Sequence, residues 1–525
     1  MRKLKAAIIL DNLSLTSWQR SALLEASELL DVKVIINCKN TKNSKNKVRN
    51  FLYYVINIFT LRNKYTKRFE YYISNEKKVD FDCDYEGSWQ SIPSEVSIHL
   101  SDIEVVIKFG MSLLKIDEKI SKLPILSFHH GDPSKYRGRP AGFYELLYNE
   151  EKCGLIVQRL TNELDSGEVL AFAESKLVHY SYKKSAEQFY KSSKHLLRKA
   201  LINLNDGRTI PIANNGKNYR LPNNSTVIKF FLVLLKRRVD HLFYGAFFEK
   251  KWKVGTVKFE PILNDNNLID LYDVNELKID PQYNFYADPF FSLDGSKIRL
   301  EALSNKSGLG DIIEIELSDA GQFQLLLTGK HYSFPFSFSF NGAEHLLPEV
   351  ASHSSQYFFN LSNNKEKLHI KGLEGKRIVD ATLLKSNDLW YLFFGEEKSA
   401  HSSLNLWVSN SIDEVFHKHP SSPVCISPSS ARMAGRILST DDGLFRFGQN
   451  NNRAYGSSIT VSEITLLGSD VYEERECGSI KVSEGLGPHS IDFNKNKGIV
   501  LIDYYKDEFS LLAGVRRFKA LLSKS

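Results

Sequence analysis

The sequence contains little cysteine, and its cysteines are not paired. Among 525 residues there are five cysteines, none at the short spacings of zinc sites or disulfide frameworks. No cluster of metal-ligating residue types stands out, so we predict no metal site. Scattered single thiols are typical of a reducing compartment, and we therefore expect a cytoplasmic protein.

The sequence also lacks a long apolar run. The runs at residues 51–61 and 228–235 are far shorter than the roughly 20 residues of a spanning helix. The N-terminal run at 6–10 ends at Asp11, too soon for a signal peptide, and we interpret it as a buried strand. The second run continues into basic and aromatic residues, which predicts a basic amphipathic helix. This helix is expected to link two domains, with peripheral membrane contact as the alternative.

Charge of one sign does not dominate the chain. The net charge of +7 is spread over 525 residues, with basic clusters at 42–49, 62–68 and 229–253. Such clusters are more often solvated faces than phosphate-binding grooves, so no nucleic-acid partner is predicted. An anionic substrate such as a sugar nucleotide would suit them equally well. Because single cores rarely exceed about 300 residues, at least two domains are expected.

The first half of the sequence predicts an α/β domain at residues 1–205 with a largely parallel sheet, because short apolar runs alternate with helical periodicity. The expected strands are 6–10, 32–36, 104–109 and 125–128, and the expected helices are 18–30 and 185–204. Residues 206–225 are rich in Asn, Gly and Pro. We therefore place a linker and the amphipathic helix at 206–250.

The second half, residues 251–525, predicts an all-β domain. Short β-branched and aromatic runs recur between turn residues, and five segments interrupt them at intervals of roughly 30 to 60 residues. These segments are 287–291, 347–350, 379–383, 433–436 and 488–491. Five repeats of this length predict a five-bladed β-propeller, with a pair of β-sandwiches as the structural alternative.

Polar residues gather after the expected strand at 125–128. His129 and His130 follow this strand, and small turn residues come next. In α/β sheets, ligands bind at the carboxyl ends of strands, so these histidines are candidates for a site. The alternative is that they only cap a turn.

Residues 127–138 read SFHHGDPSKYRG, which resembles, without a gap, the folate-dependent formyltransferase pattern Asn-x-His-Pro-Ser-Leu-Leu-Pro-x-Tyr-Arg-Gly. Residues 163–170, ELDSGEVL, resemble that family's Leu-Asp-Thr-Gly-Asp-Ile-Leu loop, and 154–160 resemble its preceding strand. Residues 109–114, FGMSLL, resemble the stretch that lines the folate pocket. The resemblance implies a Rossmann-like formyltransferase fold.

The resemblance also implies site residues and a cofactor. His129 would stabilise the oxyanion that forms when an amine attacks a formyl carbon, and Asp165 would orient His129 and help take the amine's proton. Ser127 replaces the family's asparagine, and His130 could compensate for the lost amide donor. The folate of the donor, formyltetrahydrofolate, would contact Gly110, Met111, Ser112, Leu113 and Leu114. The departure at Ser127 leaves a catalytically decayed domain as an alternative.

The expected acceptor is an amino sugar. Nothing after residue 206 resembles the tRNA-binding domain of the methionyl-tRNA enzymes of that family, whereas sugar N-formyltransferases carry varied C-terminal parts. The resemblance therefore implies formyl transfer to a nucleotide-linked amino sugar in surface polysaccharide biosynthesis.

The second half resembles the five-bladed propellers of arabinanase-like and fructosidase-like glycosidases, because residues 285–290, FYADPF, are similar to their first-blade acid motif. Asp288, Glu349, Asp380 and Arg436 would then surround a common funnel, Glu349 and Asp380 lying on the inner strands of the next two blades. Arg432, Gln449 and His489 could add polar groups. We expect these residues to bind sugar. The alternatives are glycoside hydrolysis, alone or beside formyl transfer, and carbohydrate binding without catalysis.

Overall fold

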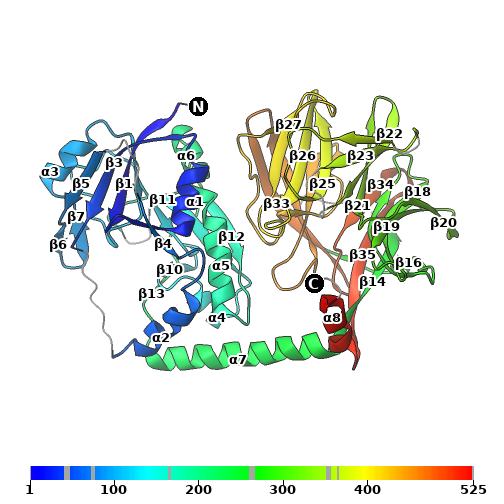
Figure 1. The fold of residues 1–525 in the computed structure, drawn as a ribbon, viewed down its shortest axis with the longest axis horizontal. Helices are drawn as coiled ribbons and strands as arrows, with labels where there is room; N and C mark the ends of the chain where they lie inside the picture. The colour runs from blue at the N-terminus through cyan, green and yellow to red at the C-terminus, as the bar shows by residue number, and fades with distance from the viewer. Residues whose placement is uncertain are drawn as a thin grey trace. The chain divides into compact units, whose positions relative to one another are not determined.

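The computed structural model divides the chain into two compact units, residues 1–239 and 240–525. It describes residues 2–40, 48–71, 77–163, 167–258, 267–350, 356–363 and 366–522. In Figure 1 the first unit is a sheet covered by helices, and the second is a set of separate β-sheets.

The first unit is built on a nine-stranded sheet whose centre is parallel. Strands β5, β3, β1, β8 and β9 lie side by side and run parallel, followed by the antiparallel β11 and β12. Residues 6–10 of β1 are all buried, as expected for a parallel strand covered on both faces. The strands of the unit are β1 Leu4–Asp11, β2 Ser14–Thr16, β3 Leu30–Cys38, β4 Arg68–Glu70, β5 Lys77–Phe81, β6 Asp84–Glu86, β7 Trp89–Ser91, β8 Val105–Lys108, β9 Ile125–His129, β10 Tyr136–Gly138, β11 Lys152–Arg159, β12 Glu168–Lys176 and β13 Lys217–Tyr219.

Short helices accompany this sheet. They are α1 Ser17–Glu25, α2 Phe51–Thr60, α3 Ser94–Ser97, α4 Phe143–Leu147, α5 Tyr182–Ser193 and α6 Leu196–Asn205, with a 3-10 turn at Ile98–Leu100. Helices α5 and α6 replace the single helix expected at 185–204, and both contact β12. The α/β fold and its four expected strands are therefore confirmed.

The second unit is a five-bladed β-propeller, as predicted. Blade 1 is β17 Tyr283–Phe291, β18 Lys297–Ser304, β19 Gly310–Glu316 and β20 Asp319–Leu327. Blade 2 is β21 Ser333–Phe340, β22 Ala343–Glu349, β23 Tyr357–Asn360 and β24 Glu366–His369. Blade 3 is β25 Ile378–Ser386, β26 Leu389–Glu396, β27 Asn405–Ser409 and β28 His417–Lys418. The first strands contact one another, since β17 touches β21 and β21 touches β25, so they line the centre.

Blades 4 and 5 both combine strands from the C-terminal part of the unit with strands from its start. Blade 4 contains β29 Arg432–Met433, β30 Leu438–Thr440, β31 Gly443–Gln449, β32 Ile459–Leu467, β33 Tyr472–Val482 and the added strand β15 Asn267–Leu271. Blade 5 contains β34 Ile491–Asn494 and β35 Ile499–Phe509 from the C-terminal end, with β14 Phe248–Lys258 and β16 Asn275–Glu276 from the start of the unit. Eleven paired positions join β14 to β35, and this pairing holds the ring shut.

A single helix, α7 Asn224–Phe247, leads from the first unit into the second. The expected linker segment before it is partly structured, because β13 pairs with β10 inside the first unit. The chain ends in α8 Ala513–Leu522. Among the described residues, no helix is long and apolar enough to span a bilayer.

Candidate functional site in the propeller centre

The structure places the residues of the N-terminal motif at the end of β9. Ser127 is buried within the sheet between Lys108 of β8 and Gln158 of β11. His129 is the last residue of β9, and its Nε2 lies 3.5 Å from the backbone oxygen of Tyr136. Asp165 lies outside the described residues.

His130 belongs to the packed interior of the first unit. Its Nε2 lies 2.9 Å from the hydroxyl of Ser193, and its ring packs against Trp18, Phe189 and Tyr190. Burial, with a smaller effect of His129, lowers the pKa of His130 to about 3. The cavity beside this ring measures about 10 Å³, room for roughly one water molecule. The neutral imidazole therefore serves packing here.

The segment expected to line a folate pocket is anchored in the core. The backbone N–H of Met111, which has a positive φ of 54°, donates to Asp11 at 2.9 Å. A Cβ at Gly110 would lie 2.6 Å from the Asp11 carboxylate, so this position requires glycine. Ser112 bonds to Gln90, and Leu114 is buried. Packing and hydrogen bonding inside the first unit therefore account for the residue types at positions 110–114.

In the propeller, two of the predicted carboxylates occupy equivalent bulges. Asp288 of β17 and Asp380 of β25 have φ values of +48° and +49°, and the pairing register shifts at both positions. Phe334 holds the same place in β21, with φ +47°. A left-handed residue in a bulge re-aims its side chain, and strain of this kind persists only where the surroundings enforce it.

Glu349 is not on an inner strand, contrary to the prediction. It ends β22, the second strand of blade 2, opposite Ser333. Glu301 of β18 occupies the corresponding position in blade 1, opposite Ala287 of β17. Glu349 ends the second strand of blade 2 and lies beside the bulge at Asp380, on the first strand of blade 3. The backbone N–H of Asp380 accordingly donates to Glu349 at 3.2 Å.

Asp380 is held by two side chains of blade 4. Arg432 forms an ion pair with both of its oxygens, and Gln449 donates to it at 3.3 Å. Asp380 is buried, whereas Arg432 and Glu349 remain partly exposed. This part of the cluster therefore meets solvent through Arg432 and Glu349.

His489 joins a second pair of carboxylates. Its Nδ1 lies 3.2 Å from both Asp288 and Asp503, and its Nε2 lies 2.7 Å from the Tyr455 hydroxyl. Burial alone would lower the pKa of His489, but Tyr455, Asp503 and Asp288 outweigh it and raise this pKa well above its ordinary value. The imidazolium therefore neutralises part of the acidic cluster.

Asp288, His489 and Asp503 lie close enough together to be considered as a cation site. Ligand atoms of Asp288, His489 and Asp503 lie within 4.8 Å of one another, a set that the sequence analysis did not foresee. Backbone N–H groups of Asp288 and Ser490 already occupy the two oxygens of Asp503, at 2.9 and 2.6 Å. A protonated His489 suits this arrangement better than a metal ion, because a metal ligand must be the neutral imidazole.

Two glutamates of the cluster are tuned toward the protonated form. Burial first, and then the neighbouring Asp380, raise the pKa of Glu349 well above its ordinary value, against the opposing effect of Arg432. Burial and Asp288 raise the pKa of Glu301 in the same direction. A protonated carboxyl can donate a hydrogen bond to a sugar oxygen or pass on a proton.

Arg436 does not join this group in the way the sequence suggested. It pairs with Asp492 at 3.3 Å, donates to the backbone oxygen of Ser337, and lies over the ring of Phe336. Arg432, four residues earlier, meets Asp380 instead. Glu301, Asp503 and Tyr455 were missed by sequence reasoning, although the correspondence of Glu301 with Glu349 could have revealed the first.

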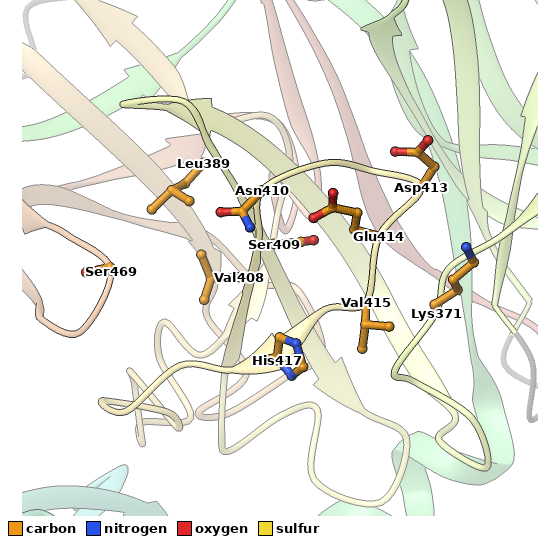
Figure 2. A pocket seen from close by; sticks show the side chains of 10 residues that line it. All are labelled: Lys371, Leu389, Val408, Ser409, Asn410, Asp413, Glu414, Val415, His417 and Ser469. Atoms are coloured by element: carbon orange, nitrogen blue, oxygen red, sulfur yellow. The ribbon is translucent and has the colours of Figure 1, made fainter. Parts of the chain in front are cut away.

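A separate recess of about 570 Å³ lies on blade 3 (Figure 2), where Lys371, Asp413, Glu414 and His417 surround apolar side chains. It lies at the outer strands β27 and β28, away from the first strand of that blade. The pKa of Asp413 is lowered by a hydrogen bond from Ser411, which indicates a loop-ordering role. The recess contains none of the predicted site residues.

Residues 266–489 match the family model described as glucosamine inositolphosphorylceramide transferase 1, N-terminal. Curated relatives of that name from Arabidopsis thaliana and Oryza sativa subsp. japonica are 31% identical over 213 residues and 28% identical over 207. These alignments cover 37% and 36% of this chain, and 27% and 28% of the relatives. The chain thus spans about a quarter of the length of the curated relatives it matches.

Solved structures give weaker likenesses. A glycinamide ribonucleotide transformylase from Symbiobacterium toebii has a TM-score of 0.28 and 14% identity, over 42% of this chain and 94% of that one. A sugar N-formyltransferase from a Shewanella species has a TM-score of 0.28 and 11% identity, over 44% and 88%. A family-43 glycoside hydrolase has a TM-score of 0.32 and 10% identity, over 42% and 93%. Likenesses of this size say nothing about activity.

These comparisons correct the functional predictions. The relatives are named for glucosamine and inositolphosphorylceramide, so the predicted folate-dependent formyltransferase activity, with formyltetrahydrofolate as its donor, is wrong. The motif resemblance predicted the fold correctly, because the turn after a strand of an α/β sheet restricts which residues can follow that strand. It did not predict the reaction, because the reaction depends on the side chains that converge at the site. The coarser prediction of a transferase with a sugar-containing substrate agrees with the relatives' name.

Proposed function

We propose that this chain takes part in glycosyl transfer, and that the propeller centre binds the sugar of a substrate. The observation that carries the proposal is the convergence of Asp288, Glu301, Glu349 and Asp380 from blades 1 to 3, with Arg432 of blade 4 beside them. Carboxylates, a guanidinium and an amide together offer the acceptors and donors that sugar hydroxyls need.

The charge of this centre favours an amino sugar. Asp288, Glu301, Glu349, Asp380 and Asp503 face only two cationic groups, Arg432 and His489, within the described network. A sugar ammonium would add a third cation to this excess of carboxylates. The relatives' name contains glucosamine, which has such a group.

The relatives' name also supports the reaction class. We propose a glucosamine unit, supplied in nucleotide-linked form, as the transferred group, and the inositol-bearing lipid inositolphosphorylceramide as the acceptor. The chain spans about a quarter of the length of those relatives, so their names support the whole reaction only indirectly. Within the proposed reaction, the propeller geometry supports the step of sugar binding.

The test is a calorimetric titration of glucosamine and of glucose into the native protein and into Asp288→Asn. Asparagine tolerates the positive φ of Asp288, so the backbone is retained while one carboxylate is lost. We expect glucosamine to bind more tightly than glucose, and Asp288→Asn to weaken glucosamine binding about tenfold, as for a charged hydrogen bond.

The matched control is Asp388→Asn, since Asp388 is exposed and also has a positive φ, of 60°. This variant should bind glucosamine as the native protein does. Equal binding of glucose and glucosamine, or an equal loss in both variants, would contradict the proposal. Transfer of labelled glucosamine from a nucleotide-linked donor to inositolphosphorylceramide then tests the reaction class.

A further inference from the structure

Helix α7 carries two apolar faces, of which one is covered. Val227 and Phe230 are buried against Phe143 in the first unit, and Arg237 donates to the backbone oxygen of Leu146 at 2.7 Å. The second face is exposed and follows helical spacing along the helix. Its residues are Ile228, Phe231, Leu232, Leu235, Val239, Leu242 and Phe243, each between 47% and 63% exposed.

Leu242 and Phe243, the part of this face that belongs to the second unit, adjoin the C-terminal segment of the same unit. The ring of Phe243 contacts Phe247, and Phe247 stacks on Phe509. From there Leu511, Leu512, Val515 and Phe518 form a stripe at helical spacing on and before α8, and each is at least half exposed. Figure 1 shows α8 at the C-terminal end of α7, within the second unit.

A cationic recess adjoins the same segment. Its volume is about 820 Å³, and six cationic side chains line it against three carboxylates. The cationic residues are Lys250, Lys251, Lys253, Lys278, Arg516 and Arg517. Arg516 and Arg517 lie on α8, between the exposed Val515 and Phe518. Arg517 also donates to backbone oxygens at the end of α7, so the recess and the apolar stripe share one helix.

We propose that the α7–α8 surface of the second unit docks on an anionic phospholipid membrane. We define this surface as the cationic recess together with the exposed apolar residues Leu242, Phe243, Phe509, Leu511, Leu512, Val515 and Phe518. The apolar side chains would enter the boundary between headgroups and acyl chains. The recess would bind lipid phosphates, because its six cationic side chains outnumber its three carboxylates.

Charge decides between a membrane and a second copy of the chain as the occupant. Two copies that met through this surface would bring the same excess of positive charge together, which opposes association. An anionic bilayer supplies both the apolar layer and the opposite charge. The size of the exposed face, spread over two helices and Phe509, exceeds the scattered apolar residues of an ordinary surface.

The test is cosedimentation of the full chain with vesicles of phosphatidylcholine alone, or with about a third phosphatidylserine. The native protein should bind the anionic vesicles at least tenfold more tightly. Leu512→Ser/Phe518→Ser should weaken this binding about tenfold or more, because two inserting side chains are lost. Lys251→Glu/Lys278→Glu should remove the preference for phosphatidylserine.

The matched control is Leu24→Ser/Ile98→Ser, which changes two exposed apolar residues of the first unit, 74% and 69% exposed. This variant should bind vesicles like the native protein. The proposal is overturned if the native protein binds neither vesicle or if all variants bind alike. A native dimer that Leu512→Ser/Phe518→Ser converts to monomer, without vesicle binding, would assign the surface to a second copy.

Discussion

Two places in this chain collect polar residues at strand ends or bulges, and they differ in what surrounds them. At the end of β9, His130 is enclosed by aromatic rings and bonded to Ser193. In the propeller centre, Asp288 and Asp380 meet charged partners from two other blades. Packing therefore accounts for the residues at the end of β9. Packing does not account for the charged cluster of the propeller centre, whose members come from distant segments, and we ascribe this cluster to ligand binding.

The largest expected effect concerns the charged cluster. Arg432→Ala should lower the free energy of unfolding by about 3–5 kcal/mol, because it leaves Asp380 buried without its cation. Glucosamine binding should be lost as well. Urea denaturation checks the stability, and Arg475→Ala, which breaks the exposed pair with Glu463, should cost less than about 1 kcal/mol. Similar losses in the two variants would show that the cluster is not an enclosed network.

A second prediction concerns a buried acid of the first unit. Burial raises the pKa of Glu145 to about 7, so the folded state keeps a proton that the unfolded chain loses above its ordinary pKa near 4.5. Stability from this group is therefore present below pH 4.5 and is lost as the pH rises to about 7.

Glu145→Gln should remove that loss and gain about 3 kcal/mol over the native protein at pH 7 and above, with no gain below pH 4.5. The Cys153 thiol, 3.4 Å from Glu145, keeps an acceptor in the variant. Urea denaturation across this pH range measures the difference. A pH-independent difference would mean that Glu145 titrates normally.

The smallest effects separate the two histidines of the motif. His130→Ala should lower the free energy of unfolding by about 2 kcal/mol, since it opens a cavity among Trp18, Phe189 and Tyr190. His129→Ala, at a half-buried strand end, should cost about 1 kcal/mol or less. Thermal or urea unfolding measures both. Glucosamine binding should be unchanged in both variants, and its loss would transfer sugar recognition to the first unit.

Part of the molecule was predictable because the responsible forces are local. The buried strands β1, β3, β8 and β9 appear as short apolar runs, which a parallel sheet requires. The five blades appear in the sequence as five segments that interrupt the short β-branched and aromatic runs of residues 251–525. Asp288 was recognisable from the segment FYADPF at residues 285–290, and Asp380 from the recurring segment 379–383.

By itself, then, the sequence determined the α/β and propeller folds and two carboxylates of the centre. Only the tertiary structure decided that β14 and β35 close the ring, that Glu349 reaches Asp380 from a second strand, and that Arg432 rather than Arg436 pairs with it. The physical reason is sequence separation. Periodicity reports which face of a strand is buried, but a contact between residues 52 or 215 positions apart, as in Arg432 with Asp380 or Asp288 with Asp503, leaves no local trace.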